Sequence, residues 1–387
     1  MFIQRGNNNF EIELADLADP LFKITIDTTQ PGSAADTFVL PLQSTTNNFV
    51  IDWGDGNSET VTTVTSVSHT YAVGGTYQVS LDGSFSGIKF FAGFGDSDDM
   101  LKLSSIDQWG SNQWLNMQSA FNGCANMVGT YTDNPNTTLA TKMDGAFTDC
   151  SNFNSDVVLD ASGVTWINGL NGMFSGCTLF NSTVSLGDTS AIRRMQSMFM
   201  NCTNFNQPID FDTSSVTRMG EMFRGCTNFN QPINFNVPLV DRMDAMFYEC
   251  TNFNSPVNIT NSSLCTNFGA MFESCTNFNQ SVSSFDTSAA VSMHYMFWKC
   301  TNFDQDISGF DISNLNNINI NNSALQIVQD TSFSTTNYDL VLVAWDAYGT
   351  SDVKFYTQPC QYSAGAPATA RQNMIDRGWT ITDGGLV

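Results

Sequence analysis

The chain has 387 residues, which is long enough for more than one domain, and its hydrophobic content of 41% argues against general disorder. It carries 14 basic and 37 acidic residues, for a net charge of −23, and such a surface repels phosphate backbones and anionic lipids. Nucleic acid is therefore excluded as an expected partner. Membrane insertion is not expected either, because the sequence contains no run of about 20 apolar residues.

Residues 1–20 are polar and acidic, and they predict an arm that is flexible or becomes ordered on a partner. This segment has neither the basic start nor the apolar core of a secretory signal. We therefore expect either export by another route or release of the protein as part of a particle.

Residues 21–90 alternate between apolar and polar side chains, as at Phe22, Ile24 and Ile26, and glycine turns separate the apolar stretches. This pattern predicts a small β-sandwich. One turn, IDWGDG, contains Asp52 and Asp55, which either hold a calcium ion together with turn carbonyls or stabilise a hairpin. Two carboxylates without a third acidic ligand favour the hairpin, held by Asp55.

Residues 91–325 contain a repeat whose cysteines stand 24–27 residues apart, each with a phenylalanine three residues before it. A fixed period of this length predicts a solenoid, in which each repeat buries its apolar face against its neighbours. The cysteines in register are Cys124, Cys150, Cys177, Cys202, Cys226, Cys250, Cys275 and Cys300.

Within one repeat, residues Met219 to Cys226 place apolar side chains at i, i+3, i+4 and i+7, the stripe of a short amphipathic helix. An asparagine-rich turn follows, and then Ile233 and Phe235 alternate with polar residues as in a short strand. The predicted fold class is thus an α+β repeat, a leucine-rich-repeat-like solenoid with one short helix and one short strand in each coil of about 25 residues. Stacking of the coils predicts a spine of phenylalanines, a parallel sheet and a ladder of asparagine side chains.

The ten cysteines allow three interpretations: a disulfide framework, a metal site or buried thiols. Eight of them end an apolar stripe, no CxxC pair occurs, and only His69 and His294 are available as histidine ligands. Buried thiols are favoured, since a free cysteine packs as a small hydrophobic residue. No metal or other cofactor is expected.

Residues 326–387 lose the period and predict an α/β unit that covers the last coil. The expected elements are a helix over Tyr338–Tyr348, a strand over Val353–Tyr356, a helix over Pro367–Arg377 that Gly378 ends, and a strand over Trp379–Thr382.

Two motifs carry a resemblance to known families. The stretch IDWGDG followed by VSHTYAVGGTYQVSL resembles a domain of the polycystic-kidney-disease (PKD) type, and MFRGCTNFNQPI resembles the repeats of BspA-like leucine-rich-repeat surface proteins. The C-terminal unit is similar to the end of such proteins. This resemblance implies an extracellular or surface-displayed, non-enzymatic interaction protein of the kind found in bacteria, protists and phage genomes.

The candidate binding face lies where the repeats differ, one and two residues before the cysteines. In the last full coil, His294, Tyr295 and Trp298 also lie off the apolar stripe, and they predict an aromatic patch suited to protein or sugar contacts. The alternative is that the C-terminal unit folds over this patch. The full candidate set is Arg224, Tyr248, Glu249, Glu273, His294, Tyr295, Trp298 and Lys299.

No catalytic constellation is apparent, so the protein is expected not to be an enzyme. The expected function is that of a phage virion component, a head-decoration or fibre protein, displayed on the virion surface. It would bind other virion proteins through its N-terminal region, and a host-surface protein or glycan is a further expected partner. The alternatives are a secreted adhesin on the bacterial cell surface and, because aspartates abound, a sugar-binding or polysaccharide-degrading protein.

Overall fold

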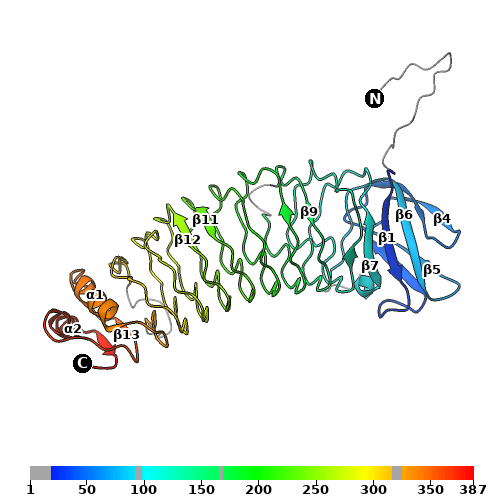
Figure 1. Cartoon of the computed structure of the whole chain (residues 1–387). Coiled ribbons are helices and arrows are strands. Elements are labelled where there is room, and N and C mark those ends of the chain that lie inside the picture. The colour runs from blue at the N-terminus through cyan, green and yellow to red at the C-terminus, as the bar shows by residue number, and fades with distance from the viewer. Residues whose placement is uncertain (1–18, 92–97, 165–168, 316–324) are drawn as a thin grey trace, which may run out of the picture.

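The structure, a computed structural model, describes residues 19–91, 98–164, 169–315 and 325–387. The predicted N-terminal arm therefore lies almost entirely outside the described residues. Figure 1 shows an elongated molecule with a β-sheet unit at the N-terminal end, a stack of coils in the middle and a helical unit at the C-terminal end. No helix among the described residues combines the length and apolar character needed to cross a membrane.

The N-terminal unit consists of a six-stranded sheet with strand order β4-β3-β6-β1-β7-β8 and a two-stranded sheet of β2 and β5. The strands predicted over residues 21–83 are confirmed, and their inward side chains, such as Phe22 and Phe38, are fully buried. The sequence did not predict β4, because only Val61 of this edge strand is buried. The bounds are β1 Phe22–Asp27, β2 Thr37–Pro41, β3 Asn47–Asp52, β4 Ser58–Thr62, β5 Ser66–Thr70, β6 Thr76–Phe85, β7 Leu103–Gln108 and β8 Val128–Gly129, with a 3₁₀ turn over Asp98–Lys102.

The six-stranded sheet continues into the first coil of the solenoid. Strand β7 pairs antiparallel with β1 on one side and parallel with β8 on the other. The aromatic core is continuous as well, because the ring of Trp109 lies 6.0 Å from that of Phe22 and 5.8 Å from that of Phe121 in the first coil. The two parts of the molecule are therefore joined by both backbone pairing and core packing.

Asp55 stabilises the hairpin turn in the N-terminal unit, as predicted. Its carboxylate accepts a hydrogen bond from the backbone amide of Asn57 and lies 2.7 Å from Nε2 of His69. The hydrogen bond with His69 lowers the pKa of Asp55 to about 2. The His69 ring is itself stacked on Trp53, with ring centres 5.2 Å apart, so the turn is fixed from two sides.

The helix predicted in each coil is wrong. Residues 219–226 form two consecutive turns, because Glu221 and Gly225 have left-handed backbone angles, with φ of 58° and 73°. Their amides alternate between two kinds of partner: the amide of Met222 donates within the turn to Met219, whereas that of Phe223 donates to the next coil. Residues with positive φ interrupt an α-helix, which requires right-handed angles throughout.

The same two left-handed positions, five and one residues before the cysteine, occur in all eight coils. Most of them hold residues other than glycine, for which this conformation is unfavourable by roughly 1–2 kcal/mol. The hydrogen bonds between coils offset this strain. The first position is held by Ser119, Gly145, Gly172, Ser197, Glu221, Ala245, Ala270 and Tyr295, and the second by Gly123, Asp149, Gly176, Asn201, Gly225, Glu249, Ser274 and Lys299.

The continuous parallel sheet expected along the solenoid is also wrong. Among the described coils, parallel strand pairing is limited to β7 with β8 at the first coil, β9 (Val157–Val158) with β10 (Val184–Ser185), and β11 (Ile233–Asn236) with β12 (Val257–Thr260). Isolated parallel bridges, such as Arg218 with Arg242, join further coils at another position. Elsewhere a buried threonine takes the place of strand pairing. The hydroxyl of Thr189 donates to the carbonyl of Asp212 in the next coil and accepts from its amide, so one side chain satisfies both groups.

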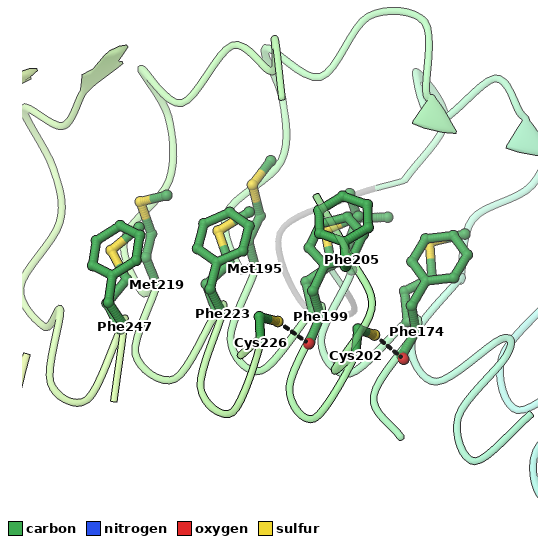
Figure 2. Close-up of a cluster of buried hydrophobic side chains, with 14 of the residues drawn as sticks. Phe174, Met195, Phe199, Cys202, Phe205, Met219, Phe223, Cys226 and Phe247 are labelled. Atoms are coloured by element: carbon green, nitrogen blue, oxygen red, sulfur yellow. Dashed lines mark hydrogen bonds between the residues drawn. The ribbon is translucent and has the colours of Figure 1, made fainter. Parts of the chain in front are cut away.

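The phenylalanine spine is confirmed (Figure 2). From Phe121 to Phe297, the rings three residues before successive cysteines stack with centres 5.3–5.8 Å apart and planes within 15° of parallel. A second column begins at Phe153 and ends at Phe333. Offset and parallel stacking of buried rings is a large source of core stability.

The asparagine ladder is confirmed too. The side-chain oxygen of each asparagine in the column from Asn154 to Asn279 accepts a hydrogen bond of 2.8–2.9 Å from the backbone amide of the equivalent residue in the next coil. Asp304 continues the ladder and accepts from the amide of Ser334. The ladder thus runs from the second coil to the C-terminal unit.

All ten cysteines are buried free thiols, which confirms the favoured interpretation. From Cys150 onward, each thiol in register donates to the carbonyl of the phenylalanine in the preceding coil, with sulfur–oxygen distances of 2.7–3.0 Å (Figure 2). Burial raises the pKa of Cys124 and Cys250 well above the usual value and that of Cys265 to about 12. The thiolate, the reactive form, is therefore strongly disfavoured.

We expect most of the ten thiols to react slowly with an aromatic disulfide reagent in the native protein and all ten to react promptly after denaturation. Burial both hinders access and suppresses the thiolate. The measurement is the absorbance of the released aromatic thiol against time, with and without guanidinium chloride. Recovery of mostly oxidised cysteines from denatured, unreduced protein would contradict this structure.

The C-terminal unit has the elements that the sequence predicts: α1 (Thr335–Asp346), β13 (Lys354–Tyr356), α2 (Ala366–Asp376) and β14 (Thr380–Thr382). Ser334 caps α1 by accepting from the amide of Asn337. The unit docks on the last coil because Phe355 of β13 forms a parallel bridge with Leu325, and Phe333 stacks on Phe303 at 6.3 Å.

Candidate functional site

One side chain per coil, two residues before the cysteine, forms a row along the outside of the solenoid. In the four coils from Cys226 to Cys300 this row consists of Arg224, Tyr248, Glu273 and Trp298, which we call the variable strip. Hydrogen bonds of 2.8–2.9 Å fix its register, because the carbonyls of the last three residues accept from amides of the preceding coil. Neighbouring members of the strip are therefore held side by side.

The N-terminal half of the strip is a cation–aromatic pair. The guanidinium of Arg224 lies 4.8 Å from the centre of the Tyr248 ring. The same guanidinium forms an ion pair of 2.7 Å with Glu221. Because both charged groups are well exposed to solvent, we assign this ion pair little stability of its own.

The C-terminal half contains the aromatic patch that the sequence predicts. The ring of Tyr295 lies 5.3 Å from that of His294 and 4.9 Å from that of Trp298, and the ammonium of Lys299 lies 4.2 Å from the centre of the Trp298 ring. These contacts arise across two tight turns and not along a helix. Whether the patch binds a partner stays a prediction.

The C-terminal unit meets this patch through a hydrogen bond and does not enclose it. The indole Nε1 of Trp298 donates to the carboxylate of Asp330 at 3.0 Å, while the Trp298, Tyr295 and His294 side chains all remain partly exposed. The ring of Trp298 is thus anchored on one edge by Asp330, contacted by Tyr295 and Lys299, and still partly exposed.

Glu273 is buried, although the sequence places it on the candidate binding face. Only 9% of its surface is exposed. Burial raises its pKa to about 7; the positive charge of Lys299 opposes this shift, and the negative charge of Glu249 adds to it. Burial also lowers the pKa of His294, whose Nδ1 lies 2.6 Å from the hydroxyl of Ser292.

Glu221 and Asp330 belong to the site and were missed by the sequence analysis. Glu221 pairs with Arg224 three residues later, a spacing that the sequence displays. Asp330 lies 30 residues after Cys300, beyond the 24–27-residue period, so the repeat pattern does not indicate its contact with Trp298.

No metal site is recognisable in the described part of the chain, where no three His, Cys, Asp or Glu side chains are grouped to hold an ion. The strip instead combines aromatic rings with charges of both signs. Such a surface is suited to non-covalent contacts.

Glu273 predicts a specific dependence of stability on pH. Between pH 4.5 and about 7 the folded protein keeps the Glu273 proton while the unfolded chain loses it. The folded state binds more protons in this window, so the free energy of unfolding falls as the pH rises through it. In Glu273→Gln the free energy of unfolding is expected to fall less over this pH range, by on the order of 1–3 kcal/mol.

The measurement is urea denaturation at intervals from pH 4.5 to 8. Glu249→Gln is the matched control, because it removes the same charge from an exposed neighbour and should largely preserve the slope. Equal slopes for wild type and Glu273→Gln would contradict the assignment.

Together, these features define a protein of the repeat-solenoid class, with a β-sheet unit at one end and an α/β unit at the other. Three overlapping stretches, residues 89–185, 168–268 and 233–336, match the family described as "Mycoplasma protein of unknown function, DUF285". The chain belongs to this family, which confirms the repeat part of the resemblance to BspA-like surface proteins. No curated protein and no solved structure matches the chain.

Proposed function

We propose that the protein is a non-enzymatic interaction protein, displayed on the surface of a phage virion, that presents its solenoid to partners. One observation carries the proposal: an invariant frame of stacked rings, thiols and amides supports outward side chains that differ from coil to coil. A frame of this kind tolerates changes at the outward positions because the stability resides in the core and in the bonds between coils.

The ends of the molecule support attachment from the N-terminal side. At the far end, β13 and α1 cover the last coil, so a further coil does not add there. The N-terminal β-sandwich, which resembles a PKD-type domain, shares its sheet with the first coil and serves as a rigid spacer. A net charge of −23 keeps neighbouring displayed copies apart.

In this proposal the partners are other virion proteins at the N-terminal region and a host-surface protein or glycan at the variable strip. The alternative setting is a bacterial cell surface, where the same solenoid acts as an adhesin. Both settings need the same outward face, and they differ in the structure that carries the protein.

The test is quantitative mass spectrometry of purified phage particles, cell envelopes and medium from one culture that produces the protein. We expect recovery with the particles at a fixed number of copies per particle. If the protein is found in the envelope or the medium and none is found on particles, the virion proposal is wrong and the adhesin alternative takes its place.

Removal of residues 1–20 tests the point of attachment. We expect the truncated protein to fold and to be lost from particles, while Trp298→Ala, at the far end, leaves particle occupancy unchanged. Full occupancy by the truncated protein would show that the arm is not the anchor.

Host polysaccharide incubated with the full chain is expected to keep its length. Shortening of the polysaccharide would favour the polysaccharide-degrading alternative.

A further inference from the structure

We propose that the C-terminal half of the variable strip binds a neutral saccharide unit, with Glu273 making hydrogen bonds to sugar hydroxyls and with Tyr248, Tyr295 and Trp298 providing ring contacts. This inference rests on the proposed role of the strip as an interaction face, and it names the chemical class of the ligand.

The first support is Glu273 itself. Its side chain is nine-tenths buried, but its carboxyl oxygens are not among the sealed polar atoms of the described residues, so they reach the surface, where they take no part in the hydrogen bonds or ion pairs found there. Burial removes part of the water around the carboxyl without supplying a protein partner, so a ligand that hydrogen-bonds to it at the surface is favoured. Sugar hydroxyls both donate and accept, so they satisfy the carboxyl in either protonation state.

The second support is the placement of the rings. Register hydrogen bonds put Glu273 between Tyr248 in the preceding coil and Trp298 in the following coil. The indole of Trp298 is fixed by Asp330, and Tyr295 lies against it at 4.9 Å. A ring held in place loses little conformational freedom on binding, which favours contact with the apolar face of a sugar ring.

The third support is the size of the patch. Successive spine rings in these three coils are 5.3 and 5.5 Å apart, so the patch extends for about 11 Å along the solenoid. This length suits one or two sugar rings, whereas a standard protein interface buries about 800 Å² on each partner.

The charge of the patch further favours a neutral ligand. Glu249 and Asp330 lie beside Lys299 and Arg224. A charged ligand, whether positive or negative, would therefore be repelled by one pair of these side chains while the other pair attracts it. Hydroxyl groups, in contrast, donate to the carboxylates and accept from the ammonium and guanidinium.

The test is isothermal titration calorimetry of the full chain with cellohexaose, maltohexaose, mannohexaose and N-acetyl-chitohexaose. We expect at least one of these neutral probes to bind. For that probe, Glu273→Ala and Trp298→Ala are each expected to weaken binding at least tenfold. Asn302→Ala is the matched control, since this exposed residue lies two positions after Cys300, outside the variable strip, and its truncation should leave the affinity unchanged.

Thermal unfolding of each variant separates lost contact from lost folding. If Trp298→Ala is unstable, two other variants take its place. Trp298→Phe keeps an aromatic ring at the same position, and Tyr248→Ala removes a ring two coils away. Tyr248→Ala should weaken binding at least threefold. Failure of all four probes to bind, equal affinity for the wild type and Glu273→Ala, or tighter binding of hexagalacturonate than of any neutral probe would overturn the inference. Sugar binding does not depend on where the protein is displayed, so particle fractionation can fail while this test succeeds, and the reverse also holds.

Discussion

Removal of residues 227–250 is expected to leave a folded protein that is one coil shorter. The deletion joins Cys226 to Thr251 at equivalent positions, so that Phe223 meets Phe272 and Asn206 meets Asn254 in the stack. Each coil contacts only its neighbours, and equivalent residues replace those that are lost. Circular dichroism and size-exclusion chromatography should show a cooperative, monodisperse protein.

Removal of residues 227–238, half a coil from the same point, is expected to prevent folding. It moves the buried positions of every later coil out of line with those before it and breaks the thiol, amide and ring columns together. The expected result is loss of cooperative unfolding or aggregation. Equal stability of the two deletion variants would contradict a solenoid whose coils are held in register.

Phe247→Ala is expected to lower the free energy of unfolding by about 3–5 kcal/mol, as for other large-to-small core changes. The Phe247 side chain is fully buried and its ring stacks on Phe223, Phe253 and Phe272 at 4.6–5.5 Å. Truncation of the ring leaves a gap in a column that has one ring per coil. Urea denaturation, with an unchanged slope, measures the loss.

Leu264→Ala is the control for that experiment. This residue belongs to the adjacent coil but is 53% exposed, so its truncation should change stability by no more than about 0.5 kcal/mol. A similar effect of both substitutions would mean that the spine is not the main source of stability.

The buried positions of the solenoid could be predicted from sequence, but their backbone conformation could not. Apolar residues at Met219, Met222, Phe223 and Cys226 are all fully buried, as the periodicity indicates. Two consecutive four-residue turns give nearly the same spacing as two turns of helix, so periodicity alone does not distinguish them. The sequence signal that distinguishes turns from a helix is glycine at Gly145, Gly172 and Gly225, because glycine destabilises a helix and adopts the left-handed turn conformation readily.

The candidate site could be predicted only where it follows the period. The fixed repeat places Tyr248, Glu273 and Trp298 in one row, and the sequence therefore identifies them as neighbours. The burial of Glu273 depends on the packing of side chains from adjacent coils, for which the periodicity carries no information. The contact between Trp298 and Asp330 depends on how the chain leaves the last coil, where the period ends.

The alternating amides of the turns also determine how the molecule responds to a pulling force. Every second amide between Met219 and Gly225 donates to the next coil, so these bonds lie along the long axis of the molecule. Tension between the two ends loads them along their length, and the coils should detach one at a time, beginning at an end. Each detached coil of 24–27 residues would add roughly 80–95 Å of extended chain, so a pulled solenoid should lengthen in steps of similar size.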